Sequence, residues 1–246
     1  MISVEEQQMS DQAYAETENN HAQEVLLIDE RELADLQYIE VSKRGYRILK
    51  RAADIVLSAM GLIVLAVPMA VLAAAIYIDD PGKVLFRQKR VGLEGKTFRF
   101  YKFRTMKEDT PRYLATAEVE NPEQYITRLG SFLRRSSLDE LPQLINVLKG
   151  DMSLVGPRPL IAKEEDIHRM RLLFGVYNVR PGITGLAQIN GRDTVRPAQK
   201  VRWDVKYLET FGLGTDLKIL LSTLPKALSG SDVVEGGSRA EEDKNG

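Results

Sequence analysis

Cysteine is absent from the 246-residue sequence, and histidine occurs only twice, as His21 and His168. The lack of thiols excludes a disulfide scaffold, a thiolate zinc site and a cysteine nucleophile. Two imidazoles are too few for a histidine-rich metal centre, and a Ser-His-Asp hydrolase would have to use one of them. These absences exclude several common enzyme classes before any motif is considered.

The net charge of −1 hides a strong asymmetry along the chain. Residues 1–40 hold eleven acidic residues and one basic residue, whereas residues 41–246 hold 33 basic and 24 acidic residues. A basic body of this kind favours an anionic partner such as nucleic acid, phospholipid or a phosphorylated substrate. The acidic segment is typical of a solvated tail.

A run of 24 residues without charge, residues 55–78, predicts a membrane helix. A straight helix of that length is about 36 Å long, which exceeds the roughly 30 Å of a bilayer core. The run has almost no polar face, which argues against a buried helix of a soluble domain. More than fifty residues precede it, which argues against a secretory signal.

The flanks of this run give conflicting topology signals. Basic residues precede it and Asp79 and Asp80 follow it, which places the N-terminal side in the cytoplasm. A straight span would then send the basic remainder of the chain outside. Pro68 lies inside the run and kinks a helix, because it removes a backbone donor and clashes with the preceding turn. Two topologies follow: a re-entrant helix that returns to the same face, or a spanning helix that tolerates the proline.

The remaining pattern predicts a mostly α-helical fold with a small β-hairpin, in the α+β class. The hairpin strands are expected over residues 83–90 and 96–104, around a turn at 91–95. The two helices expected last carry basic and aromatic residues at helical spacing, which suits either a membrane surface or ordinary core packing. Helices are expected over residues 24–40, 121–135, 138–149, 161–174, 198–211 and 215–228, and loops over 150–160 and 180–192.

Asp139 and Glu140 open one of the predicted helices. Ser137 and Glu140 fit a capping box, and carboxylates in a first turn complement the helix dipole, so a structural role is the ordinary interpretation. The functional alternative uses the same position, because an ionised aspartate beside a phosphate site attacks phosphorus or holds a divalent cation. Adjacent residues point about 100° apart on a helix, so the two carboxylates cannot do one identical job.

A supply of cations around turns and strand ends favours the functional alternative, because guanidinium groups bind phosphate oxygens through a bidentate fork. Arg158 lies between Pro157 and Pro159, which stiffen its loop and aim its side chain. The segment 180–192 has three glycines that let backbone approach a ligand, although it matches no established phosphate-loop spacing. The full set is Arg87, Lys89, Arg90, Lys102, Arg104, Arg134, Arg135, Arg158, Arg180 and Arg192. Together they indicate phosphoryl chemistry on an anionic substrate at a membrane.

Five stretches of the sequence resemble the bacterial sugar transferase family, the small monotopic polyprenyl-phosphate phosphoglycosyl transferases. They span about 175 residues in the right order, and the third is long and specific. The stretches are KRAADIVLSAMGLIVLAVP (50–68), FRQKRVGLEGKTFRFYKFRTM (86–106), RLGSFLRRSSLDELPQLINVLKGDMSLVGPRPL (128–160), RPGITGLAQINGR (180–192) and WDVKYLETFGLGTDLKILLSTL (203–224).

The resemblance implies transfer of a sugar 1-phosphate from a UDP-sugar to undecaprenyl phosphate, with release of UMP. This reaction would open a capsule, exopolysaccharide or glycoprotein pathway. Asp139 would be the nucleophile of a ping-pong reaction with a covalent phosphosugar intermediate, assisted by Glu140, and both carboxylates would hold Mg²⁺. Phosphate binding is expected of Lys102, Arg104 and Arg158, which match family motifs, and also of Arg135 and Arg192.

The resemblance also implies a re-entrant membrane helix broken at Pro68, in the bacterial inner membrane, with the catalytic domain on the cytoplasmic face. The family's break often reads Ser-Pro, whereas this chain has Val67-Pro68. The expected partners are UDP-sugar, undecaprenyl phosphate and membrane lipid; the late helices suit a homodimer, and no nucleic acid is expected. The expected parts are an acidic, largely disordered tail (1–41), the membrane helix (42–80), the cytoplasmic catalytic domain (81–228) and a disordered tail (229–246).

Two other functions stay open at this stage. A single-span protein whose basic domain binds anionic lipid or nucleic acid without catalysis would tolerate Asp139→Asn, and its binding would weaken steeply with salt. A membrane-bound phosphatase with an aspartyl-phosphate would release sugar phosphate to water and form no lipid product. The sequence leaves the sugar open among N-acetylated amino sugars, galactose and glucose.

Overall fold

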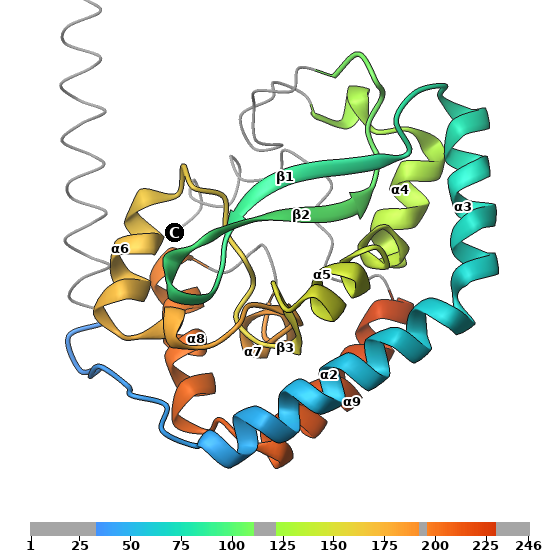
Figure 1. Ribbon diagram of the computed structural model, residues 1–246. Helices are drawn as coiled ribbons and strands as arrows, with labels where there is room; N and C mark the ends of the chain where they lie inside the picture. Colours follow the sequence, from blue (N-terminus) through green and yellow to red (C-terminus); the bar gives the residue numbers. More distant parts are fainter. Residues whose placement is uncertain (1–32, 111–121, 192–195, 230–246) are drawn as a thin grey trace, which may run out of the picture.

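The computed structural model describes residues 33–110, 122–191 and 196–229 of the chain. These residues form mostly helices and two small sheets (Figure 1). This composition confirms the predicted α+β class. The α-helices are α2 (Arg44–Val64), α3 (Ala66–Asp79), α4 (Arg128–Arg135), α5 (Gln143–Lys149), α6 (Glu165–Leu173), α7 (Leu186–Ile189), α8 (Pro197–Glu209) and α9 (Leu213–Ser229). The strands are β1 (Leu85–Val91), β2 (Thr97–Phe103), β3 (Ser153–Val155) and β4 (Gly182–Thr184), and the 3₁₀ turns are η1 (Leu93–Gly95), η3 (Pro122–Tyr125), η4 (Leu138–Glu140) and η5 (Val176–Asn178).

The helices α2 and α3 form a pair bent by 60°. Within the described ranges, no single helix is long and apolar enough to cross a membrane, but this bent pair passes the same criteria of length and composition. The break falls at Leu65, three residues before the proline expected to cause it. The reason is that the ring of Pro68 conflicts with the carbonyl four residues earlier, at Val64, which is the last residue of α2.

The bent pair and α9 leave many apolar side chains exposed. Ile63, Val67 and Ile78 of the bent pair are 77%, 72% and 79% exposed. Leu217 and Leu221 of α9 are also exposed. Apolar side chains gathered in this way on a few helices mark a surface that contacts another protein or a membrane.

The predicted hairpin is confirmed. Strands β1 and β2 pair antiparallel, with Leu85 opposite Phe103 and Val91 opposite Thr97. The turn η1 joins them, and Gly95 adopts the left-handed conformation there with φ +71°. Phe100 and Phe103 of β2 are buried in two separate clusters, so the hairpin is held from both faces.

A second sheet replaces the two loops expected from the sequence. Strands β3 and β4 pair in parallel, with Ser153 opposite Gly182 and Val155 opposite Thr184. A Cβ atom on Gly182 would lie 2.1 Å from the nitrogen of Gly156, so only glycine fits. Gly182 therefore serves backbone packing between the two strands of this sheet.

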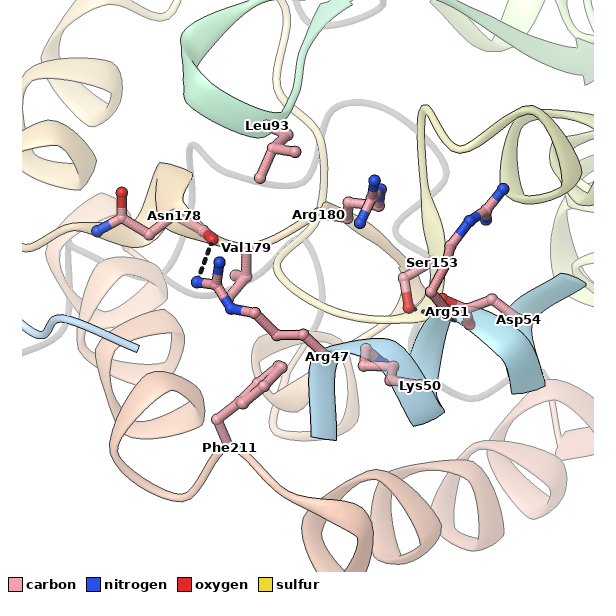
Figure 2. A pocket seen from close by; sticks show the side chains of 10 residues that line it. All are labelled: Arg47, Lys50, Arg51, Asp54, Leu93, Ser153, Asn178, Val179, Arg180 and Phe211. Carbon is pink, nitrogen blue, oxygen red and sulfur yellow. Dashed lines mark hydrogen bonds between the residues drawn. The ribbon is translucent and has the colours of Figure 1, made fainter. Parts of the chain in front are cut away.

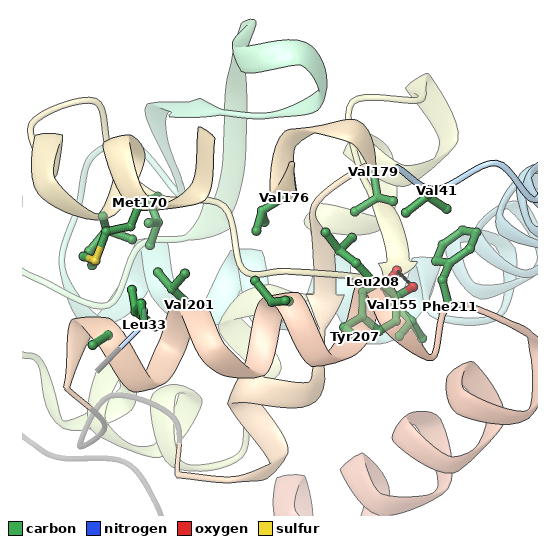
Figure 3. Packing of buried hydrophobic residues seen from close by; sticks show 14 of the residues in the cluster. Leu33, Val41, Val155, Met170, Val176, Val179, Val201, Tyr207, Leu208 and Phe211 are labelled. Carbon is green, nitrogen blue, oxygen red and sulfur yellow. Dashed lines mark hydrogen bonds between the residues drawn. The ribbon is translucent and has the colours of Figure 1, made fainter. Parts of the chain in front are cut away.

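The main core lies between α8, α6 and β3 (Figure 3). It includes Val155, Val201 and Tyr207, and also Leu33 and Val41 from the end of the acidic segment.

Three expected helices differ from those observed. Residues 33–40 contain a turn followed by irregular chain, so the helix predicted over 24–40 is wrong there, and its remainder lies outside the described residues. The helix expected over 121–135 is a 3₁₀ turn followed by α4, and that over 138–149 is η4 followed by α5. The tail expected over 229–246 lies, apart from its first residue, outside the described residues.

Candidate active site

Asp139 lies in η4, the short turn between α4 and α5, and its side chain is only 6% exposed. Ser137 precedes it in the left-handed conformation, with φ +56°, and makes no capping hydrogen bond. The capping box predicted from Ser137 and Glu140 is therefore wrong, because a cap residue has extended backbone angles. A non-glycine residue held in this conformation is uncommon, and such residues cluster at functional sites.

Opposing effects act on the ionisation of Asp139. Burial raises the pKa of its carboxyl from 3.8 to about 6, against the attraction of the Lys102 ammonium. The neighbouring Glu140 raises the pKa further, while Arg134 and Arg158 lower it. A carboxylate with little water around it is a better nucleophile than a solvated one, and these cations keep it ionisable.

Lys102 extends from β2 toward this carboxyl. Loss of water around the ammonium lowers its pKa from 10.5 to about 8, and the nearby Asp139 opposes that shift. The Lys102 Nζ atom also lies 5.4 Å from the centre of the Phe86 ring on the paired strand. Lys102 is thus placed where the sequence predicted, beside Asp139, with Arg134 and Arg90 close enough to affect its charge.

Glu140 does not cap a helix but binds Arg158. Both terminal nitrogens of the Arg158 guanidinium lie 3.1 Å from Oε1 of Glu140. The Arg158 main chain is fixed as well, because its carbonyl accepts a hydrogen bond of 2.8 Å from Arg171. Arg171 forms a buried ion pair of 2.6 Å with Asp204 of α8. The Arg158 loop is therefore anchored to the core, and the structure places Arg158, predicted to bind phosphate, beside Glu140.

Arg134, rather than the predicted Arg135, is directed to the site. A Cβ atom on Gly130 would lie 2.0 Å from the carbonyl oxygen of Thr105, so α4 packs tightly against that residue. Arg134, one turn later on the same face, donates a 2.9 Å hydrogen bond from Nε to the Thr105 hydroxyl. Arg135 is exposed. The signal that sequence reasoning missed was Gly130, which marks the face of the helix that packs closely.

Arg104, another of the predicted phosphate-binding residues, is not placed at Asp139. Arg104 is buried and binds Glu108 at 2.7 Å and Asp80 at 3.2 Å, so it ties β2 to the end of α3. Its charge is thereby balanced by two carboxylates. Arg192 lies outside the described residues.

The carboxylates Asp139 and Glu140 are the candidate metal ligands. In the described parts of the chain, no group of three or more histidine, cysteine, aspartate or glutamate residues could hold a metal ion. Mg²⁺ in phosphoryl-transfer sites commonly uses one or two carboxylates and completes its coordination with water and substrate phosphates. The pair therefore fits a cation that shares its coordination with a diphosphate, rather than a closed protein cage.

A buried carboxylate surrounded by cations defines an anion-binding site suited to phosphoryl chemistry. The family model for the bacterial sugar transferase matches residues 45–230, which include the bent helix pair and every described residue of this site. The chain belongs to the bacterial sugar transferase family, a family of enzymes.

Several similar proteins are named for sugar 1-phosphate transfer or for exopolysaccharide production. One is the UDP-glucose:undecaprenyl-phosphate glucose-1-phosphate transferase of Caulobacter vibrioides, 44% identical over 190 residues, which cover 73% of this chain and 70% of that protein. The Escherichia coli protein of the same name is 42% identical over 188 residues, which cover 73% of this chain and 40% of that protein. The exopolysaccharide production protein ExoY of Sinorhizobium fredii is 36% identical over 192 residues, covering 72% of this chain and 84% of that protein.

Proposed function

We propose that this protein transfers a sugar 1-phosphate from a UDP-sugar to undecaprenyl phosphate and releases UMP. The observation that carries the proposal is the environment of Asp139. This residue is only 6% exposed, yet its carboxylate is close enough to Lys102, Arg134 and Arg158 to be stabilised by their charge. Family membership and the names of the similar proteins support the substrates. UDP-glucose is the first donor to test, because two of these relatives are named for it.

The proposed reaction has two displacements at one phosphorus atom. In the first, a carboxylate oxygen of Asp139 bonds to the β-phosphorus of the UDP-sugar, the bond from that phosphorus to the bridging oxygen breaks, and UMP leaves with the electron pair. In the second, a phosphate oxygen of undecaprenyl phosphate bonds to the same phosphorus and the aspartyl carboxylate leaves. A covalent intermediate lets a water-soluble donor and a lipid acceptor, both anionic, use the site in turn.

The surrounding residues have separate roles in this proposal. Lys102 and Arg134 stabilise charge on the transferred phosphoryl group, since preorganised cations in a site with little water act strongly on developing charge. Arg158 holds Glu140 in place and presents its remaining guanidinium hydrogens to substrate phosphate. Mg²⁺, held by Asp139 and Glu140, would offset the repulsion between the carboxylate and the diphosphate.

The exposed apolar side chains of α2, α3 and α9 support a membrane location for this reaction. We propose that the bent pair enters the inner membrane and returns to the cytoplasmic face. This topology places Asp139 on the side where a soluble nucleotide sugar and a lipid phosphate are both accessible.

The test is turnover by the purified, detergent-solubilised protein with Mg²⁺, UDP-glucose and undecaprenyl phosphate. The expected products are UMP and a lipid diphosphate-sugar in equal amounts, and Asp139→Asn should lose at least a thousandfold in rate. Asp151→Asn, a carboxylate in the turn after α5, is the matched control and should keep its rate within about threefold. Release of free sugar phosphate without a lipid product would instead identify a phosphatase.

A further inference from the structure

A second cationic site lies between α2, the turn η1 and the chain that leads into β4 (Figure 2). It is a cavity of about 60 Å³. Four cations line it: Arg47, Lys50 and Arg51 from α2, and Arg180 from the segment before β4. None of the residues assigned above to the Asp139 site lines this cavity.

The cations are held in place mainly by carbonyl groups. Arg47 donates to the carbonyl of Asn178 at 2.8 Å, and Arg180 donates to the carbonyl of Gly150 at 2.8 Å. Arg51 donates to two carbonyls at the end of α5, at 2.6 and 2.9 Å. Carbonyl contacts orient a guanidinium group and offset part of its charge, here at the C-terminal end of α5, but they do not neutralise it as a carboxylate does.

The cavity carries a surplus of positive charge. Lys50 is balanced by Asp216 of α9, 2.5 Å away. Among the described residues, the three arginines have no carboxylate within ion-pair distance, and Arg51 and Arg180 are near enough to repel one another. Asp54 is the single carboxylate that lines the cavity, and one of its oxygens already accepts hydrogen bonds from the Ser153 hydroxyl and the Leu154 amide. The carboxylate of Glu94, in the turn η1, is also near enough to interact with Arg180. Three positive charges therefore face two negative charges, and the surplus favours an anion of small size.

The position of the cavity points to an anion carried by a lipid. The same helix that supplies three of the cations exposes Ile48, Leu49 and Val56 on its other side, at 66%, 55% and 63%. If this apolar side lies in the bilayer, as in the proposed function, the cavity is at the depth of the phosphate groups. Basic residues at that depth attract anionic headgroups.

We propose that this cavity binds the phosphate group of an anionic lipid through Arg47, Arg51 and Arg180. The inference rests on the membrane location in the proposed function. The phosphate has two sources in such a membrane, a phospholipid headgroup and the polyprenyl phosphate acceptor, and a separate assay distinguishes each.

The headgroup assay compares binding of the full chain to vesicles of phosphatidylcholine with and without phosphatidylglycerol. The ratio of the two affinities should fall by more than about fivefold in Arg47→Gln and in Arg180→Gln, because about fivefold is the loss expected for any one cation near an anionic surface. Arg44→Gln is the matched control, because it removes one charge from the same end of the same helix but does not line the cavity. Arg180→Lys should retain the ratio, and thermal melting verifies that each variant is folded.

The acceptor assay measures the KM for undecaprenyl phosphate in neutral phosphatidylcholine nanodiscs. A KM about fivefold or more higher in both Arg47→Gln and Arg180→Gln, with an unchanged ratio of the vesicle affinities, would support the site. It would assign the bound phosphate to the acceptor. Equal changes in Arg44→Gln, or wild-type values in both assays, would overturn the proposal. Formation of the lipid diphosphate-sugar by the wild-type protein is recorded in parallel: its absence would refute the proposed function, while the vesicle assay still tests the cavity.

Discussion

Asp139 and Lys102 are each shifted by burial in the direction that disfavours charge, and each partly restores the charge of the other. The nucleophile must be ionised to attack phosphorus, and the ammonium must be protonated to stabilise the phosphoryl group. The two requirements hold together only between the two pKa values. The local charge balance thus couples the reactivity of the site to pH.

The first prediction concerns the rate of lipid-independent UMP release as a function of pH. Release should rise as the pH passes about 6, where Asp139 loses its proton, and fall as the pH passes about 8, where Lys102 loses its proton. Lys102→Arg should remove the alkaline decline, because arginine stays protonated in this range. A decline above pH 8 that persists unchanged in Lys102→Arg would contradict the assigned role of Lys102.

At the scale of single elements, α2 is hydrogen-bonded to the parts of the protein that carry the site. Asp54, 3% exposed, accepts hydrogen bonds from the Ser153 hydroxyl at 3.1 Å and the Leu154 amide at 3.0 Å. Strand β3 leads directly to the Arg158 loop. Arg51 binds the end of α5, the helix that follows Asp139. The bent pair and the site are therefore mechanically linked.

Asp54→Ala should destabilise the folded protein by about 2–3 kcal/mol, because it leaves the buried Ser153 hydroxyl and the partly buried Leu154 amide without their partner. Denaturant unfolding in a fixed detergent measures the change. Asp35→Ala removes a carboxylate that is 65% exposed and forms an ion pair with Arg202, and it should leave the midpoint of unfolding unchanged. Equal midpoints for the Asp54→Ala and wild-type proteins would show that this link contributes nothing to stability.

Pro68→Ala should straighten the bent pair, because it restores the amide that the Val64 carbonyl lacks. The chain has no cysteine, so spin labels attach only where one is introduced, at the exposed positions Ile48 and Ile78. A straight helix would separate these positions by about 45 Å, and the 60° bend shortens that separation by about 6 Å. Double electron–electron resonance should show a longer distance in Pro68→Ala. An unchanged distance would mean that the bend has another cause.

The elements that the sequence predicted are those with a local signal. The hairpin has a short turn and alternating side chains, and the bent pair has an uncharged run with one proline. The β3–β4 sheet could not be predicted, because its three-residue strands exist only through pairing with a segment about thirty residues away. The same limit applies to Ser137, whose left-handed conformation follows from tertiary packing, and to the choice between Arg134 and Arg135, which depends on how α4 packs against Thr105.

For the whole molecule, the proposed re-entrant topology predicts on which side of the membrane each part lies. If the bent pair returns to the face it entered, the start of α2 and the body of the protein are on the same side. Ser42 and Glu209 are both exposed, so a single cysteine introduced at either position shows on which side of the membrane that position lies. In intact spheroplasts, neither should react with a membrane-impermeant maleimide, and both should react in inverted vesicles. Reaction of only one of them in spheroplasts would identify a spanning helix.

The most direct test of the central claim is the intact mass of the protein after incubation with Mg²⁺ and UDP-glucose in the absence of any lipid. One equivalent of UMP should be released and the mass of the protein should increase by that of one hexose phosphate less water, and both changes should be absent in Asp139→Asn. Addition of undecaprenyl phosphate should then remove the adduct. Turnover in the presence of lipid, without a burst of UMP or an adduct in its absence, would contradict the covalent role of Asp139 and indicate direct transfer between the two substrates.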